Sequence, residues 1–453
     1  MAPFNLSERL DTIDDLVQVF RDNDYETDMY DFPDEYTNWI EEQQAVRNSC
    51  TLVDQSFHMS PLYIEGPDAV TFFEDLGTNT FENFKMGSPP KAKNVVFCNP
   101  NGYMIRDVIL FYIEEDTFIS AGTEIPTNWQ LYNLEANDYD VEYKVPYRPN
   151  QGKKPEEFRF QIQGPNAYEV IDQITDEGIP EISFFEMMEV QINGIDTFVL
   201  GFGMAEVAGV EIFGSFEHHD DIKETILGIS EKFGIRQMGS KAYKTNKIGS
   251  GWIHQPVPAI YSSDRLEGYR EWLGTDGPEA RMSIGGSFEG NTIEDYYLTP
   301  YECGQKHLVD FDHDFVGSEA LATMDREESR QKVTFRWDPD DVIDVYRSLF
   351  AKGETNKYIN LPDTARQWSL THYDRITKDG KTVGIAKYPG YLYYTREMLA
   401  LGVIDPKYSE PGTEVTLVWG DRPSSKRKVE HHVQTEIECT VEPSPYIRSD
   451  RRE

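Results

Sequence analysis

The chain has 453 residues, which is too long for one hydrophobic core and predicts two or three domains. Its 43 Lys and Arg against 80 Asp and Glu give a formal net charge of −37, which excludes a basic nucleic-acid-binding surface and disfavours an anionic membrane as a partner. Because the acidic residues are spread along the chain, we interpret them as a solvated surface suited to high salt, typical of a halophile. An ordinary acidic enzyme is the alternative interpretation.

Cysteine usage and the absence of targeting signals predict a cytoplasmic protein. Cys50, Cys98, Cys303 and Cys439 are far apart and form no CxxC pair, so we expect free thiols rather than a zinc or disulfide framework. The N-terminus has no basic and apolar signal region, and no apolar run approaches the roughly 20 residues of a membrane span. We expect a monomer or a small homo-oligomer.

Helices and short strands alternate irregularly through the first part of the chain. Residues 6–20 have helical apolar spacing with Asn5 or Ser7 as the cap, and residues 34–47 predict a second helix. Predicted strands, bounded by turn residues, are 95–98, 108–113, 117–120, 158–163, 190–192, 197–200 and 210–213. Helices are expected to begin at residue 167 and to cover 221–233, and residues 149–157 predict a linker.

The pattern changes after about residue 325. Predicted strands there are 332–336, 382–386, 391–394, 414–419 and 435–441, which indicates a β-rich, sandwich or jelly-roll-like C-terminal domain. The whole pattern favours an α+β class over a doubly wound parallel sheet.

Two motif-like segments do not support the sites they suggest. The glycines at 201, 203 and 209 have the wrong spacing for a dinucleotide fingerprint, and a strand follows them. The acidic run at 310–314 could hold a metal, but we interpret it as a solvated turn. No metal is therefore expected.

Three isolated polar residues are candidates for a cavity. Gln55 and His58, three residues apart and flanked by apolar residues, could both project inward, although a lone histidine is more often structural. Glu211 lies between Val210 and Ile212 in a predicted strand. Its carboxylate either lies on the solvent-exposed face of the strand or accepts hydrogen bonds from a bidentate N–H donor such as a pterin edge. The pattern alone favours the solvent-exposed face.

The stretch 238–258 is the most informative in the chain. It places Tyr243 and Trp252 among several hydrogen-bonding side chains and three glycines, which is typical of an irregular cavity lining. A buried tyrosine can donate a proton to a phenolic leaving group, and an indole offers a flat face for a ring.

Several segments together resemble the glycine-cleavage T-protein (aminomethyltransferase) superfamily. They follow that family's order and cover most of the chain: 54–56, 64–68, 101–107, 162–165, 209–212, 314–320, 412–415 and 418–420. Within it, segments 54–59, 160–167, 239–246 and 251–253 are most similar to the tetrahydrofolate-dependent O-demethylases of methoxylated aromatic acids, the vanillate and syringate demethylases.

The resemblance implies a fold, a cofactor and a set of site residues. It implies a three-domain ring with folate in a central cavity, divided as 1–60 with 155–325, an inserted domain 61–154, and a barrel-like domain 326–453. It implies that Tyr243, His58 and Gln55 lie near the methyl donor. It implies tetrahydrofolate contacts from Glu211, Trp252, Asp107 and one of Gln161 and Gln163.

Two departures from the family pattern bear on the substrate. The aminomethyltransferases have paired aspartates where this chain has Arg106 and Asp107, so only the second carboxylate is retained and amine chemistry on a carrier is disfavoured. Thr123 aligns near the arginine with which aromatic-acid demethylases hold the substrate carboxylate. The loss of a bidentate clamp would change substrate preference, unless Arg106 compensates.

The resulting hypothesis is methyl transfer from an aryl methyl ether to folate N5. A phenol with a reference pKa of about 10 matches the basicity of a phenolate leaving group, so Tyr243 is the expected proton donor, and His58 either orients the substrate oxygen or relays the proton. The alternatives are a small N-methyl or S-methyl donor, a folate-binding protein without turnover, and an aminomethyltransferase.

Overall fold

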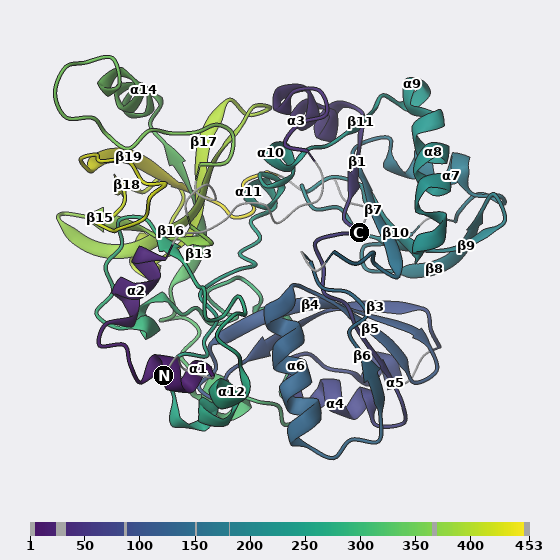
Figure 1. The fold of residues 1–453 in the computed structure, drawn as a ribbon. Helices are drawn as coiled ribbons and strands as arrows, with labels where there is room; N and C mark the ends of the chain where they lie inside the picture. Colours follow the sequence, from purple (N-terminus) through teal and green to yellow (C-terminus); the bar gives the residue numbers. More distant parts are fainter. Residues whose placement is uncertain are drawn as a thin grey trace.

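Three β-sheet units surround the centre of the molecule in the computed structural model (Figure 1). The structure describes residues 5–23, 33–85, 88–149, 152–180, 182–364 and 369–447. Most strand pairs are antiparallel and helices flank the sheets, so the predicted α+β class is confirmed. The predicted domain boundaries stay a prediction, and residues 150 and 151 of the predicted linker lie outside the described residues.

The first unit is a six-stranded sheet in the order β11-β1-β7-β10-β9-β8. Its strands are Ile235–Gln237, Cys50–Asp54, Glu157–Gln163, Gly209–Ser215, Ile195–Gly201 and Met187–Ile192 in that order. Helices α7 (Ala167–Ile174) and α8 (His219–Gly228) pack on one face, against the apolar residues of β7. Because successive strand residues face opposite sides, the polar residues Arg159, Gln161 and Gln163 lie on the other face of the sheet.

The second unit is a five-stranded sheet in the order β3-β4-β5-β2-β6. Its strands are Lys91–Cys98, Met104–Glu114, Thr117–Ala121, Leu62–Glu65 and Glu142–Lys144 in that order. Helices α4 (Ala69–Leu76), α5 (Glu82–Lys85) and α6 (Glu124–Ala136) bury phenylalanine and tryptophan side chains against it.

The C-terminal unit is a closed six-stranded barrel in the order β13-β17-β16-β15-β18-β19. Its strands are Gln331–Trp337, Glu397–Ile404, Lys381–Leu392, Asp374–Lys378, Glu414–Trp419 and Thr435–Glu442 in that order. The predicted strand 391–394 is wrong in its extent, because β16 ends at Leu392 and a turn follows. Helix α14 (Pro339–Ser348) lies outside the barrel (Figure 1).

Three predicted helices differ from the observed ones at their capping residues. The helix expected at 6–20 is two helices, α1 (Leu6–Leu10) and α2 (Leu16–Asp22), because the Asp15 carboxylate accepts from the Gln18 amide and starts a second helix. The helix expected from residue 34 is α3 (Trp39–Asn48), which begins after its cap Asn38. The helix expected at 221–233 is α8 followed by the separate turn α9 (Ser230–Phe233).

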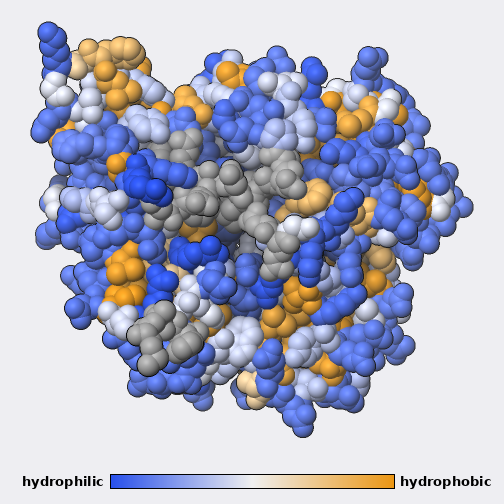
Figure 2. Space-filling view, viewed as in Figure 1, coloured by the Kyte–Doolittle hydropathy of each residue, from blue (hydrophilic) through white to orange (hydrophobic). Residues whose placement is uncertain are grey.

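The face in Figure 2 is mostly hydrophilic, with small scattered apolar patches. Among the described residues no helix is long and apolar enough to cross a membrane. The four cysteines are buried, and none forms a disulfide.

Candidate active site

A cavity of about 840 Å³ lies where the three units meet. The first unit contributes His58 and Glu211, the second contributes Asp107 and Thr123, and the barrel contributes Lys332. Short helices α10 (Ser240–Tyr243) and α11 (Asn246–Ser250) and the irregular chain after them complete the wall. The volume is in the upper part of the range of about 300–1,000 Å³ for small-molecule sites.

Tyr243 is held by two polar side chains that the sequence also predicted. The Gln55 amide nitrogen donates to the Tyr243 hydroxyl at 3.1 Å, and His58 Nε2 is 3.4 Å from the same oxygen. All three side chains are buried. The structure therefore assembles one polar group from segments more than 180 residues apart.

Helix α10, which ends at Tyr243, is anchored by acidic residues near the start of α3. The Gly239 amide donates to the fully buried Glu42 carboxylate at 2.9 Å, and the Ser240 hydroxyl donates to Asp34 at 2.8 Å. These bonds fix the first turn of α10, so the position of the phenol does not depend on its own contacts alone.

The loop that contains Gln55 and His58 is fixed by the buried carboxylate of Asp54. Asp54 accepts from the Ser56 hydroxyl at 2.7 Å, from His219 Nε2 at 2.8 Å and from the Lys223 ammonium at 3.0 Å. Burial opposes the charge, but the bonds from His219, Lys223 and Ser56 outweigh it and lower the pKa of Asp54 to about 2. The pKa of His219 is raised by its two carboxylate partners, against the effect of burial.

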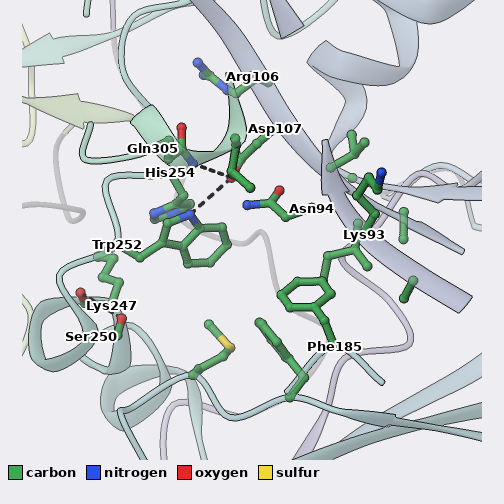
Figure 3. A pocket seen from close by; sticks show the side chains of 18 of the residues that line it. Lys93, Asn94, Arg106, Asp107, Phe185, Lys247, Ser250, Trp252, His254 and Gln305 are labelled. Carbon is green, nitrogen blue, oxygen red and sulfur yellow. Dashed lines mark hydrogen bonds between the residues drawn. The ribbon is translucent and has the colours of Figure 1, made fainter. Parts of the chain in front are cut away.

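Asp107 and Trp252 form a second polar group on the cavity wall (Figure 3). The Trp252 indole N–H donates to Asp107 at 3.1 Å, and the Gln305 amide nitrogen donates to the same oxygen at 3.3 Å. Burial raises the pKa of Asp107 to about 6, although these bonds and the Arg106 charge act in the opposite direction.

The indole of Trp252 is supported from behind by two further rings. His254 lies 4.6 Å from it between ring centroids, and Tyr388 of β16 lies 5.4 Å from His254 at 22°. Gly251 precedes Trp252 with φ at +67°, where a Cβ atom would lie 2.5 Å from the Ser444 hydroxyl, so the turn requires glycine. The ring is thus fixed by the barrel as well as by Asp107.

Glu211 is buried on the cavity wall, not on a wet outer face. It lies directly opposite Gln161 in the β10–β7 register, and its carboxylate forms an ion pair with Arg159. The Arg159 guanidinium also pairs with Glu157 at 3.2 Å and lies between the rings of Phe111 and Phe213, at 4.7 and 4.5 Å. The expectation that Glu211 lies on a solvent-exposed face, drawn from the sequence pattern alone, is wrong because both faces of this sheet are covered.

The two predicted glutamines of β7 have different partners. Gln161 accepts from Gln55 at 3.3 Å. Gln163 accepts from the Met204 amide at 3.2 Å, while its own amide nitrogen is buried and has no hydrogen-bond partner among the described residues.

The two predicted substrate residues line the cavity in different ways. Arg106 is buried, extends away from Asp107 (Figure 3), and donates to the backbone carbonyls of Ile105 and Pro256. Thr123 is half-buried at the N-terminus of α6, and its hydroxyl makes no capping bond there.

Arg159, Phe185 and Gln305 are among the wall residues that sequence reasoning missed. The alternation of β7 could have indicated Arg159, because it shares a face with Gln161. Nothing local marks the other two. The acidic run at 310–314 shows no metal arrangement, and in the described part of the chain no group of three or more His, Cys, Asp or Glu is placed to hold a metal ion.

Comparison with known proteins agrees with this architecture. Residues 22–256 match the family model described as the GCVT N-terminal domain. The chain is 36% identical over 449 residues to the syringate O-demethylase of Sphingobium sp. strain SYK-6, covering 98% of this chain and 96% of that protein. It is 28% identical to the sesamin methylene transferase of Sinomonas sp. strain No.22, covering 86% and 84%.

More distant relatives share the fold. The aminomethyltransferase of Thermotoga maritima is 24% identical over 80% of this chain and 88% of that protein. The solved structure of the glycine cleavage system aminomethyltransferase T from Bartonella henselae superposes with a TM-score of 0.63 at 17% identity, over 97% of this chain and 98% of that one. The chain belongs to the GCVT (aminomethyltransferase) family.

Proposed function

We propose that this protein is a tetrahydrofolate-dependent O-demethylase that transfers a methyl group from a methoxylated aromatic compound, of the vanillate or syringate kind, to folate. The observation that supports this most directly is the buried Tyr243 hydroxyl, bonded to Gln55 and next to His58 at the wall of the cavity. The syringate O-demethylase of Sphingobium sp. strain SYK-6 matches 98% of this chain at 36% identity.

The residues present fit tetrahydrofolate. Its flat rings and N–H donors suit a cavity with an indole face and two carboxylates, those of the half-buried Asp107 and the buried Glu211. The buried amide oxygen of Gln305, on the cavity wall, has no hydrogen-bond partner among the described residues, which indicates that a polar ligand completes the site. When bound, tetrahydrofolate supplies N5 as the methyl acceptor.

Tyr243 supplies the proton that the leaving group needs. As the methyl C–O bond breaks, its electron pair stays on the aryl oxygen, and a proton from the Tyr243 hydroxyl converts that oxygen to a phenol. An aryl oxide without a proton leaves poorly, so this transfer is worth a factor of about 10² to 10⁴ in rate.

Gln55 and His58 set the direction of that transfer. The Gln55 N–H occupies a lone pair of the Tyr243 oxygen, so the hydroxyl proton points elsewhere, toward the substrate or His58. His58, whose Nε2 is 3.4 Å from that oxygen, would return to the Tyr243 phenolate the proton that the acceptor nitrogen gives up on methylation. Holding the two reactants in line within the cavity supplies much of the rate.

The function is tested by incubating the protein and tetrahydrofolate with vanillate, syringate, guaiacol and a set of N-methyl and S-methyl compounds. We expect 5-methyltetrahydrofolate and a phenol from the methoxyarenes, measured by mass spectrometry. Comparison of the carboxylated substrates with guaiacol shows what Thr123, in place of an arginine, does to preference. Turnover of an amine or a sulfonium compound alone would show that the methyl donor belongs to the alternative N-methyl or S-methyl class. Folate binding without turnover of any donor would refute the proposal that the protein is an enzyme.

Tyr243→Phe tests the assigned role in the same assay. We expect turnover to fall by about 10²-fold or more, since the proton donor is lost, while the affinity for tetrahydrofolate stays within about twofold. Tyr143→Phe, in the exposed strand β6, is the matched control and should behave as wild type. Unchanged turnover in Tyr243→Phe would remove the phenol from the mechanism.

A further inference from the structure

Phe185, on the cavity wall, has a backbone conformation that its residue type disfavours. Its φ is +63°, in the left-handed region that a bulky residue rarely adopts. Residues in such conformations persist where surrounding structure imposes them, and they are concentrated at functional sites.

The surrounding chain imposes this conformation. The Phe185 amide donates to the Gly201 carbonyl at 2.7 Å, and the Gly201 amide donates to the Glu186 carbonyl at 2.9 Å. A Cβ atom on Gly201 would lie 2.1 Å from the Ser183 carbonyl oxygen, so the turn that contains Phe185 is pressed directly against β9. Glycine or asparagine would adopt the same turn with less strain, so a phenylalanine here requires another explanation.

The strained turn directs the Phe185 ring into the cavity. Figure 3 shows the ring beside Asn94 and across the cavity from Trp252. Phe184 and Phe202 support it from the side, with ring centroids 4.9 and 5.6 Å away in edge contacts. T-shaped contacts of this kind hold a ring in place.

The opposite wall has a fixed ring as well. Trp252 is held by its bond to Asp107 at 3.1 Å and by the ring of His254 behind it. Two aromatic side chains, one from the β8 side of the first sheet and one from the chain after α11, are therefore fixed on opposing walls of one cavity (Figure 3).

We propose that Phe185 and Trp252 form an aromatic clamp that holds a flat ring of the bound ligand between them, with Phe185 as a specificity-determining residue. The proposal deepens the proposed function and rests on it for the nature of the ligands. The ring belongs either to tetrahydrofolate or to the methoxyarene, and both present the same flat π-face.

Three substitutions distinguish the contribution of the aromatic face of Phe185 to binding from that of its volume. Phe185→Tyr keeps the face, whereas Phe185→Leu and Phe185→Met keep apolar volume without it. Calorimetric dissociation constants for tetrahydrofolate and for syringate, which need no turnover, are measured with the thermal midpoint of each variant. Phe198→Leu is the matched control, because Phe198 packs on Phe213 behind the wall and does not line the cavity.

The clamp predicts weaker binding of one ring without loss of fold. In Phe185→Leu and Phe185→Met the dissociation constant of one ligand should rise by about 3- to 10-fold, and Phe185→Tyr should bind as wild type. The ligand whose affinity falls is the one that is clamped. The proposal is overturned if Leu and Met bind both ligands normally, if Tyr loses as much as Leu, or if Phe198→Leu has the same effect. Wild type that binds both rings but transfers no methyl group would refute the proposed function and leave the clamp supported.

Discussion

At the residue scale, the site depends on pairs of side chains that modify one another. Asp107 is an acceptor for Trp252 and Gln305, and Glu211 forms an ion pair with Arg159. Asp54 stays charged through its bonds to His219 and Lys223. The hydrogen bonds and ion pairs of each carboxylate are therefore made with protein partners rather than with solvent alone.

The raised pKa of Asp107 predicts pH-dependent cofactor binding. Because its pKa is about 6, the acceptor carboxylate is lost as the pH falls below that value, and a ligand that donates to it loses affinity. We expect the dissociation constant of tetrahydrofolate, measured by indole fluorescence quenching between pH 8 and 5, to rise about tenfold per pH unit below pH 6. Asp107→Asn should bind more weakly at pH 8 and show a flat profile. A profile that persists in Asp107→Asn would assign the titration to another group.

At the element scale, the functional residues lie at the ends of regular elements, where the chain turns. Gln55 and His58 follow β1, Tyr243 ends α10, and Trp252 follows the left-handed Gly251 that terminates α11. Helix α8 covers the first sheet and also holds the loop after β1, through His219 and Lys223. The packing of α8 is thus coupled to the placement of Gln55.

Asp54→Asn tests that coupling. The lowered pKa means that the carboxylate contributes stability above its unfolded value near 4, and the contribution is lost as the pH falls toward 2. We expect Asn to reduce the free energy of unfolding by about 2 kcal/mol at pH 7, with a smaller difference at pH 3, measured by urea titration. Turnover should fall as well, because the loop loses its anchor.

Asp220→Asn is the matched control for this prediction. Asp220 contacts the other nitrogen of His219 at 2.7 Å, but its side chain is 91% exposed, so solvent screens the pair. We expect stability and turnover close to wild type. Equal effects of the two substitutions would place the stabilisation in His219 alone and contradict the role of Asp54.

At the scale of the whole molecule, three sheet units are joined around one cavity by a strongly acidic chain. The net charge of −37 acts against the compact state, because like charges on a polar surface repel one another (Figure 2). The balance of positive and negative charges is different inside the cavity, since Lys93, Lys332 and Arg159 line it together with Asp107 and Glu211.

This charge predicts stabilisation by salt. Raising KCl from about 0.1 to 1 M shortens the screening length from about 10 to 3 Å, so surface repulsion is largely removed. We expect the thermal midpoint to rise by several degrees, measured by calorimetry, and to rise less in sucrose at equal osmolality. A midpoint that is unchanged or lower in KCl would contradict the interpretation of the acidic surface as a high-salt adaptation.

Local patterns in the chain predicted many of the strands, fewer of the helices and part of the site. Residues 158–163 alternate strictly and form β7, and 414–419 form β18. The helix expected at 6–20 was wrong because one side chain, Asp15, caps a second helix within a continuous apolar pattern. For the site, Tyr243 and Trp252 were indicated by their unusual glycine-rich context, whereas Gln305 and Phe185 have no local pattern.

The sequence by itself determined the α+β class, the acidic character and, through its resemblance to a family, the residues expected at the site. Only the tertiary structure decided how they act. Glu211 lies in a strand that could face water or protein, and the packing of a second sheet buries it beside Arg159. Phe185 reaches the cavity because β9 presses on its turn, through contacts between residues that are distant in the chain. Burial, pKa and ring placement depend on such long-range contacts, and a local sequence pattern does not contain them.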